Sequence, residues 1–234
     1  MIFLNKLVGT NIGIFLTKQT SWYKNVLYIW DMPRDGRKTK TRIIDEATTL
    51  VLENGFAGTT IDQILEKTEI TKGAFFYHFK TKNDLALGLM DHFATSDLNS
   101  LNEALEYVKA NYKTPKDQLI GFVQFFINVF DDLEQPYAGC LYASCFNEPE
   151  QFPDQAKKIV SDAILEWRKQ LGDLIEAVLN DTGAKLIVDK NALADNFTVV
   201  MEGGFILSKA LGDAKLTANQ LKQYRNYLQL LFAH

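Results

Sequence analysis

The chain has little of what marks a secreted, metal-binding or membrane-spanning protein. Only two of its 234 residues are cysteines and no secretory segment is convincing, so a disulfide scaffold is not expected and the cytoplasm is the predicted location. Its three histidines are scattered without metal-ligand spacing. The apolar runs at residues 12–16 and 26–30 are far shorter than the about 20 residues of a membrane helix. The sequence therefore predicts no metal site, no cofactor and no membrane partner.

Residues that break helices or assist catalysis are also scarce. Five prolines and 14 glycines leave long stretches of 3.6-residue periodicity, which predict an all-α protein. No Gly-x-Ser-x-Gly elbow, phosphate-binding loop or nucleophile paired with a base is present, so the sequence does not predict an enzyme. The hydrophobic content of 47% is ordinary for a globular protein of one large or two small domains.

The charge is distributed unevenly along the chain. The net charge is −4, yet residues 34–82 hold nine cations against seven anions, and the excess of acidic groups lies in residues 83–234. A mildly basic segment in an otherwise acidic chain is typical of a protein that binds DNA through one region only. A solvated charged face is the alternative explanation of so modest an excess.

Residues 59–85 carry the most informative pattern. Thr60, followed three residues later by Gln63, is a capping box that predicts the start of a short helix. Thr71 is a second cap. It opens a helix whose three phenylalanines point inward and whose other face is small, polar and cationic. Such a pair of helices is shaped to enter a DNA major groove. A plain helical hairpin inside an all-α domain is the alternative interpretation.

The segment resembles the DNA-binding signature of the TetR (tetracycline-repressor-like) family of bacterial transcriptional regulators. The resemblance covers roughly residues 37–87 and rests on Gly55-Phe56, Thr59-Thr60, Ile64, Ile70-Thr71-Lys72-Gly73, His78-Phe79, Lys82 and Leu85. It implies a three-helix helix-turn-helix DNA-binding domain at residues 34–81 and a larger helical domain for effector binding and dimerisation at residues 82–234. Two positions depart from the family pattern. Glu69 replaces a small residue, often glycine, and Phe76 replaces a common tyrosine that would contact phosphate.

The resemblance implies a homodimeric repressor that binds a palindromic operator in double-stranded DNA and is released by a small molecule. The second helix of the motif is expected to lie in the major groove, and the cations of residues 37–42 nearer to phosphates. The predicted DNA-binding residues are Arg37, Lys38, Lys40, Arg42, Thr60, Thr71, Lys72, Gly73, Ala74, Tyr77, His78 and Lys82. An all-α lipid carrier or enzyme that acts on hydrophobic ligands is the alternative.

Residues 1–33 do not resemble the family and are treated as an extension. Met32 is followed by a polar, cationic opening of the kind that precedes the first helix of such regulators. We therefore interpret Met32 as the biological start and residues 1–31 as an upstream over-read of the gene. A native extension that packs through its tryptophans and tyrosines is the alternative.

Periodicity predicts the remaining helices. They cover residues 38–54, 82–110, 116–132, 140–147, 154–180, 189–212 and 217–232. Gly203 and Gly204 each cost about 1 kcal/mol inside a helix, which indicates close approach by a neighbouring helix or a subunit. In the family the last two helices form the dimer interface. The residues so assigned are Phe197, Val200, Gly204, Leu207, Leu211, Leu221, Tyr224 and Leu228.

The middle of the chain is rich in aromatic residues. A stripe of such residues is often only core, but the family places an effector cavity between these helices. An apolar cavity with few polar anchors favours lipophilic or aromatic compounds. Asn128, Asn147 and Glu202 are the polar groups expected to orient a ligand. The predicted ligand-binding residues are Phe93, Phe122, Phe125, Phe126, Cys140, Tyr142, Phe146, Trp167, Phe197 and Met201.

Cys140 has two interpretations. It lies in a Gly139-Cys140-Leu141 sequence that several family members share, at the start of a predicted helix, where the pKa of a thiol can be lowered. The first interpretation is a sensor of electrophiles or oxidants. The second is a small buried hydrophobic side chain.

Overall fold

The computed structural model describes residues 36–233. The interpretation of residues 1–33, and of Met32 as the start, lies outside the described residues. By their contacts the residues form two units, 1–41 and 42–234. In the first unit the described residues begin helix α2 (Gly36–Gly58), with the Thr41 hydroxyl donating a hydrogen bond to the carbonyl of Arg37 at 3.1 Å. All the following elements belong to the second unit.

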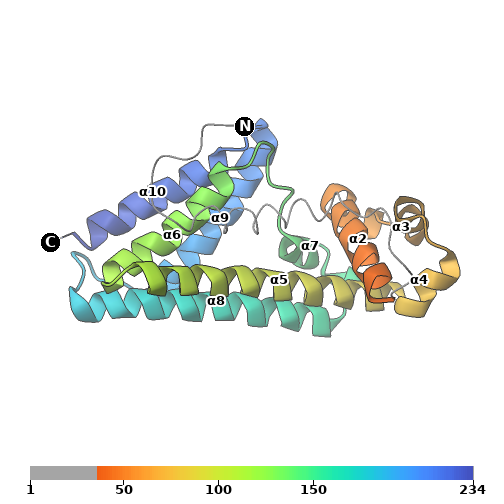
Figure 1. The fold of residues 1–234 in the computed structure, drawn as a ribbon, viewed down its shortest axis with the longest axis horizontal. Coiled ribbons are helices and arrows are strands. Elements are labelled where there is room, and N and C mark those ends of the chain that lie inside the picture. Colours follow the sequence, from red (N-terminus) through yellow and green to blue (C-terminus); the bar gives the residue numbers. More distant parts are fainter. Residues whose placement is uncertain (1–35, 234) are drawn as a thin grey trace. The chain divides into compact units, whose positions relative to one another are not determined.

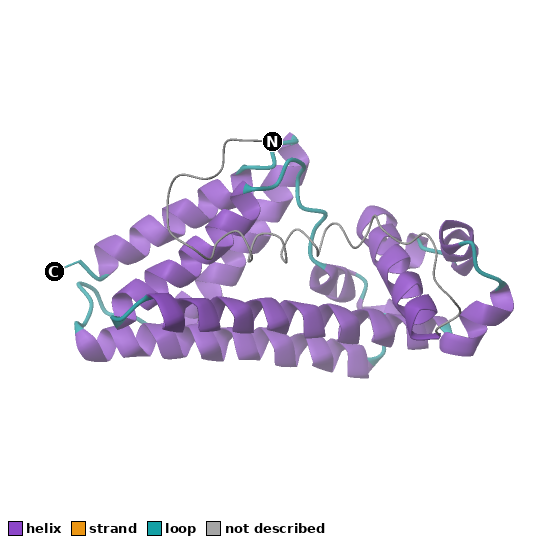
Figure 2. Cartoon of the chain, viewed as in Figure 1, coloured by secondary structure: helices purple, strands orange, loops and turns teal. Residues whose placement is uncertain are grey.

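The part of the chain that the structure describes consists of helices and loops, which confirms the all-α class (Figure 1, Figure 2). After α2 the elements are α3 (Ile61–Thr68), α4 (Lys72–His78), α5 (Lys82–Asn111), α6 (Pro115–Asp131), α7 (Leu141–Asn147), the 3-10 helix η1 (Pro149–Gln151), α8 (Asp154–Asp181), α9 (Lys190–Leu211) and α10 (Leu216–Leu231). Within residues 36–233, no helix has both the length and the apolar character needed to cross a membrane.

Threonine side chains set the starts of the helices in and after the motif. Thr60 and Thr81 complete capping boxes, in which the hydroxyl accepts a hydrogen bond from the third helical N–H and the side chain there accepts one from the threonine N–H. Thr71 caps α4 through its hydroxyl. Each such cap stabilises a helix by about 1 kcal/mol. The predicted starts of α3, α4 and α5 are confirmed because they depend on these local contacts.

Within residues 42–234, the long helices α5 and α8 run side by side, and α10 packs on α6 and α9 (Figure 1). One cluster of buried side chains extends from Ile43 in α2, through Phe75 in α4, to Ala163 in α8. The core of the helix-turn-helix motif is therefore continuous with the adjoining ends of α5, α7 and α8.

The close approach expected at the paired glycines occurs at one of them. A Cβ on Gly204 would lie 2.9 Å from the Cα of Thr217, whereas a Cβ on Gly203 would meet nothing within 4 Å. Gly204 therefore allows α9 to approach the start of α10 of the same chain.

Candidate nucleic-acid interface and ligand site

The inner side of the helix-turn-helix motif is apolar and its outer side is polar. Ile64, Phe75 and Phe79 are at most 2% exposed. Thr71, Lys72 and Gly73 are exposed at the start of α4, and Tyr77, one turn further along, is 74% exposed. α4 therefore presents the small, cationic outer face that its sequence predicts.

Tyr77 is exposed but held in place by its neighbours. The ring of His78 packs edge-on against it with a centroid distance of 5.0 Å. The ammonium of Lys80 lies 5.9 Å from the Tyr77 centroid and donates a hydrogen bond to the carbonyl of Phe76 at 2.7 Å. These contacts orient the exposed ring of Tyr77 near the end of α4.

The other predicted DNA-binding residues fall into three groups. Arg37, Lys38 and Lys40 are exposed, and Arg42, Ala74 and His78 are half-buried. The hydroxyls of Thr60 and Thr71 accept hydrogen bonds from the N–H groups of Gln63 and Ala74, both at 3.2 Å. These two threonines therefore stabilise the starts of α3 and α4.

Lys82, which is predicted to contact phosphate, has partners inside the protein. Its half-buried ammonium donates a hydrogen bond to the carbonyl of Phe56 at 2.8 Å and lies 4.7 Å from the centroid of the Phe56 ring. Burial lowers the pKa of Lys82, and the negative charge of Glu148 opposes that shift. Lys82 thus holds the end of α2 instead of pointing into solvent.

Glu69 occupies the turn between α3 and α4 in a left-handed conformation, with φ of 52° and ψ of 30°. Among residues 36–233 it alone combines a positive φ with a side chain other than that of glycine. This conformation costs an L-residue about 1–2 kcal/mol and a glycine almost nothing. The departure from the family pattern at this position therefore stores strain in the turn.

Replacing Glu69 by glycine is expected to raise the free energy of unfolding by about 1 kcal/mol, because the loss of strain exceeds the added entropy of the unfolded chain. Urea denaturation measures the difference. Glu66→Gly is the control: Glu66 is an exposed residue inside α3, and its replacement should lower stability by about 1 kcal/mol. A less stable Glu69→Gly protein would contradict the account of this turn.

Four of the predicted ligand-binding residues form one aromatic cluster. Phe122 and Phe126 of α6, Trp167 of α8 and Phe197 of α9 have ring centroids 5.3–6.2 Å apart in all six pairs. All four side chains are at most 6% exposed. Phe125, also buried, packs against Phe126 at 5.3 Å. The side chains that were expected to surround a ligand are thus close enough to stabilise one another.

Asp97 links this cluster to α7, and sequence reasoning missed it. Its Oδ2 accepts hydrogen bonds from the Tyr142 hydroxyl at 3.0 Å and from the indole N–H of Trp167 at 2.8 Å. Burial raises the pKa of the Asp97 carboxyl, and these two hydrogen bonds limit the rise. Asp97 lies four residues after Phe93 and four before Leu101. A carboxyl group on the apolar stripe of α5 is thus the sequence feature that could have identified Asp97 as a buried-side polar contact.

Cys140 and Glu202 form a second polar pair, and both side chains are half-buried. The thiol of Cys140, the residue before α7, is hydrogen-bonded to the carboxyl of Glu202 on α9. Burial, together with the Glu202 charge, raises the pKa of the thiol well above its ordinary value. A thiol held in its protonated form is a poor nucleophile. This environment favours the interpretation of Cys140 as a packing residue over that of an electrophile sensor.

Burial also raises the pKa of Glu202, ahead of the charge of Asp97, while the Cys140 hydrogen bond lowers it. The folded protein then holds this proton more tightly than the unfolded chain, so stability falls as pH rises above the ordinary value of 4.5. Glu202→Gln is expected to be more stable than wild type at pH 7 and to match it at acid pH. Urea midpoints across this range test the prediction, with the exposed Glu103→Gln as control. Equal pH profiles for wild type and Glu202→Gln would contradict it.

The remaining predicted ligand residues differ in position. Phe93 packs edge-on against Tyr142 with a centroid distance of 4.9 Å, and Met201 is half-buried. Phe146 is 50% exposed, which corrects its assignment to an internal wall. Asn128 and Asn147 are exposed as well, whereas Glu202, the third expected anchor, is half-buried.

The surface of α9 and α10 differs from the predicted dimer surface. Phe197, Leu221, Tyr224 and Leu228 are at most 3% exposed, so they belong to the core of their own chain, and Gly204 is covered by Thr217. This corrects their assignment, because a side chain without exposed area has none to offer a partner. Val200 is half-buried, while Leu207 and Leu211 are exposed. The exposed apolar residues of both helices are Val199, Ile206, Leu207, Leu211, Tyr227 and Leu230.

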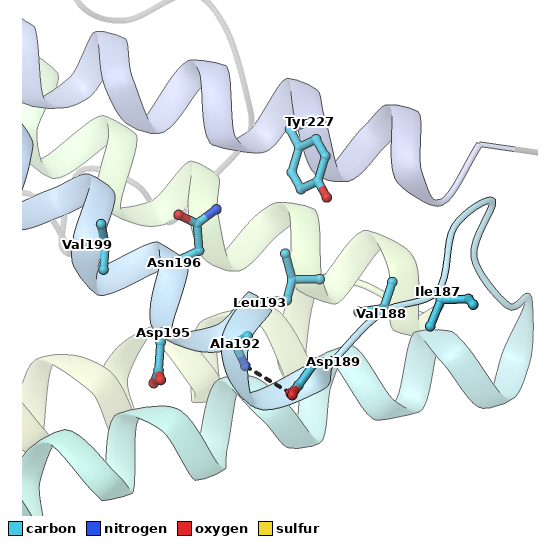
Figure 3. Close-up of a pocket in the computed structure, with 9 residues that line it drawn as sticks. All are labelled: Ile187, Val188, Asp189, Ala192, Leu193, Asp195, Asn196, Val199 and Tyr227. Carbon is cyan, nitrogen blue, oxygen red and sulfur yellow. Dashed lines mark hydrogen bonds between the residues drawn. The ribbon is translucent and has the colours of Figure 1, made fainter.

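An open pocket of about 500 Å³ lies on this same surface. Figure 3 shows Tyr227 of α10 pointing toward Leu193 of α9, with Val199 at one end of the pocket and Ile187 at the other. At its edge, both carboxylate oxygens of Asp195 accept hydrogen bonds from the guanidinium of Arg168, each at 2.8 Å. The pocket is therefore part of the exposed apolar surface and does not lie among the aromatic cluster.

Comparison with known proteins agrees with the geometry of the motif. Residues 43–89 match the family model "Bacterial regulatory proteins, tetR family". An uncharacterized HTH-type transcriptional regulator in the lacX 3′ region of Lactococcus lactis is 25% identical over 181 residues, which cover 76% of this chain and 86% of that protein. The biofilm operon icaADBC HTH-type negative transcriptional regulator IcaR of Staphylococcus epidermidis is 28% identical over 118 residues, which cover 50% of this chain and 59% of that protein.

The likeness extends to solved structures. The crystal structure of a TetR transcriptional regulator from Chloroflexus aurantiacus has a TM-score of 0.67 and 25% sequence identity, and the match covers 84% of this chain and 96% of that one. The helical arrangement beyond the motif is therefore shared as well.

Proposed function

Because the chain belongs to the TetR family of helix-turn-helix transcriptional regulators and is not an enzyme, we propose that it is a homodimeric repressor in the cytoplasm. It binds a palindromic DNA operator and leaves it when a lipophilic or aromatic small molecule binds. The observation that carries the proposal is α4, a short helix with a buried phenylalanine side and an exposed face of Thr71, Lys72, Gly73 and Tyr77.

Residues 34–81 form the proposed DNA-binding domain. α4 enters the major groove, with base edges next to Thr71, Lys72, Ala74 and Tyr77. A lysine ammonium donates well to guanine O6 and N7, and a tyrosine offers both a hydroxyl and an apolar ring. The cations Arg37, Lys38, Lys40 and Arg42 meet phosphates, which fixes register without reading sequence.

Residues 82–234 form the proposed effector-binding and dimerisation domain. A second copy covers the exposed apolar residues of α9 and α10, because large apolar side chains exposed on two packed helices favour an interaction site. A two-fold axis between the copies then matches a palindromic operator. The printed name of the IcaR relative describes a negative regulator, which supports repression.

The proposed effector enters among Phe93, Tyr142 and the aromatic cluster, next to the carboxyl groups of Asp97 and Glu202. It releases DNA only if it binds the DNA-free form more tightly, and by linkage DNA weakens effector binding by the same factor. A coupling of about 1–3 kcal/mol is typical of such pairs of sites.

The test is selection of binding sites from random DNA by the purified protein, followed by titration of the best site at several salt concentrations. The expected result is an inverted repeat, with an affinity that falls steeply as salt rises. Candidate lipophilic compounds are then added to the complex. The absence of sequence-selective binding at low salt would overturn the proposal.

A further inference from the structure

A carboxylate from a distant part of the chain holds the end of α2. Glu148, the residue after α7, accepts a hydrogen bond from the N–H of Phe56 on Oε1 at 2.8 Å and one from the N–H of Ala57 on Oε2 at 2.7 Å. The partners are 92 and 91 residues apart in sequence. Hydrogen bonds to an ionised acceptor are about twice as strong as those between neutral groups.

The two N–H groups are available because α2 is interrupted. Gly55 has φ of 76° and ψ of 164°, so the helix breaks there and the N–H groups that follow begin a new turn. A Cβ at residue 55 would lie 2.7 Å from Oε1 of Glu148. Glycine is thus required both by the backbone angle and by the approach of the carboxylate.

Phe56 is also held through its carbonyl and its ring. Lys82 at the start of α5 donates to the carbonyl at 2.8 Å. The Phe56 ring, 1% exposed, lies 4.5 Å from the ring of Phe152, which follows η1. Phe56 is therefore fixed through its N–H, its carbonyl and its ring by three residues that follow the motif, Glu148, Lys82 and Phe152.

The same short segment reaches the candidate ligand site. α7 is seven residues long. At its start, Cys140 is hydrogen-bonded to Glu202 and Tyr142 to Asp97. At its end lies Glu148. A displacement of α7 by a molecule near Asp97 or Glu202 would therefore move the carboxylate that holds α2.

We infer that Glu148 is a positioning residue for operator recognition: it fixes the orientation of the α2–α4 motif on the helices that follow. The inference rests on the proposed function, because orientation matters only if two motifs must meet two half-sites at once. Without the contact, each motif still binds a half-site, but the dimer no longer requires one spacing between half-sites.

The experiment uses the full chain with Glu148→Gln. The glutamine amide keeps the shape, but its NH₂ group cannot accept from an N–H, so one of the two hydrogen bonds is lost. Affinities are measured for the selected operator, for operators with one or two base pairs added between half-sites, and for an isolated half-site. Glu150→Gln removes the same charge from an exposed side chain in η1 and serves as control.

Wild type and Glu150→Gln are expected to bind the lengthened operators much more weakly than the selected one. Glu148→Gln should bind the selected operator about tenfold more weakly, as expected for the loss of a hydrogen bond to a charged group, and bind all spacings alike. Its affinity for the isolated half-site should equal that of wild type. Hydrogen exchange at Phe56 and Ala57 should accelerate by about tenfold while exchange in α4 stays unchanged.

Two results would overturn the inference. A Glu148→Gln protein that keeps the wild-type dependence on spacing would show that Glu148 does not position the motif. A loss of half-site binding, with faster exchange throughout α4, would show that Glu148 only maintains the fold of the motif. Wild type that binds a half-site as tightly as the palindrome would instead overturn the proposed dimeric function, and this inference with it.

Discussion

Ile206→Asp is expected to give a folded monomer that has lost tight operator binding. Ile206 is 69% exposed in the C-terminal half of α9, so an aspartate there disturbs no internal packing. In a dimer the same aspartate would be buried against apolar side chains of the second copy, which is strongly unfavourable for an unpaired charge. Linked binding to two sites typically exceeds single-site affinity by 10²–10⁴-fold. A loss of about that size is therefore expected for the palindrome.

Sedimentation and operator titration measure the two parts of this prediction. Leu165→Asp is the matched control, because Leu165 is a similarly exposed apolar residue, at 52%, on α8. It should remain dimeric and bind DNA normally. An Ile206→Asp protein that still sediments as a dimer would show that the dimer interface does not lie on α9 and α10. That result would not affect the assignment of the DNA-binding motif.

Phe197→Ala is expected to lower the free energy of unfolding by about 3–5 kcal/mol, as truncation of a buried phenylalanine does. Phe197 is fully buried, and its ring contacts those of Phe122, Phe126, Trp167 and Tyr224. The alanine would leave a void at the centre of this cluster. For a chain of this size each kcal/mol corresponds to about 2–4 °C in melting temperature.

Thermal unfolding at constant protein concentration measures this loss. Leu165→Ala, a truncation of an exposed side chain, should change stability by no more than about 0.5 kcal/mol. If Phe197 instead belonged to a dimer surface, Phe197→Ala would weaken association, and the difference in melting temperature between variant and wild type would change with protein concentration. The melting temperature is expected to shift by the same amount at all concentrations.

Sequence reasoning predicted the helices well because their borders depend on near neighbours. The hydroxyls of Thr60, Thr71 and Thr81 each bind an N–H only three residues away, and this pattern is legible in the chain itself. The inward phenylalanines of α4 follow from helical spacing in the same way. The all-α class and the helix-turn-helix motif were determined at this level.

Sequence reasoning failed where one helix offers two candidate faces. A spacing of alternating three and four residues drifts by about 20° per heptad around a straight helix. The predicted stripe on α9 begins at Phe197 in the core and ends at Leu211, whose side chain is 70% exposed. Periodicity identifies an amphipathic helix but does not say which neighbours cover it.

Only the tertiary structure decided which charged groups act together. Lys82 is predicted from the sequence to contact phosphate, and no sequence pattern singles out Glu148. In the structure both residues form hydrogen bonds with the backbone of Phe56. Asp97 joins Tyr142 and Trp167, which are 45 and 70 residues away. The oxygens of a carboxylate accept hydrogen bonds from the donors that lie next to them in the folded protein. Those donors come from helices whose relative placement depends on the packing of the whole core, and no local pattern in the sequence encodes that placement.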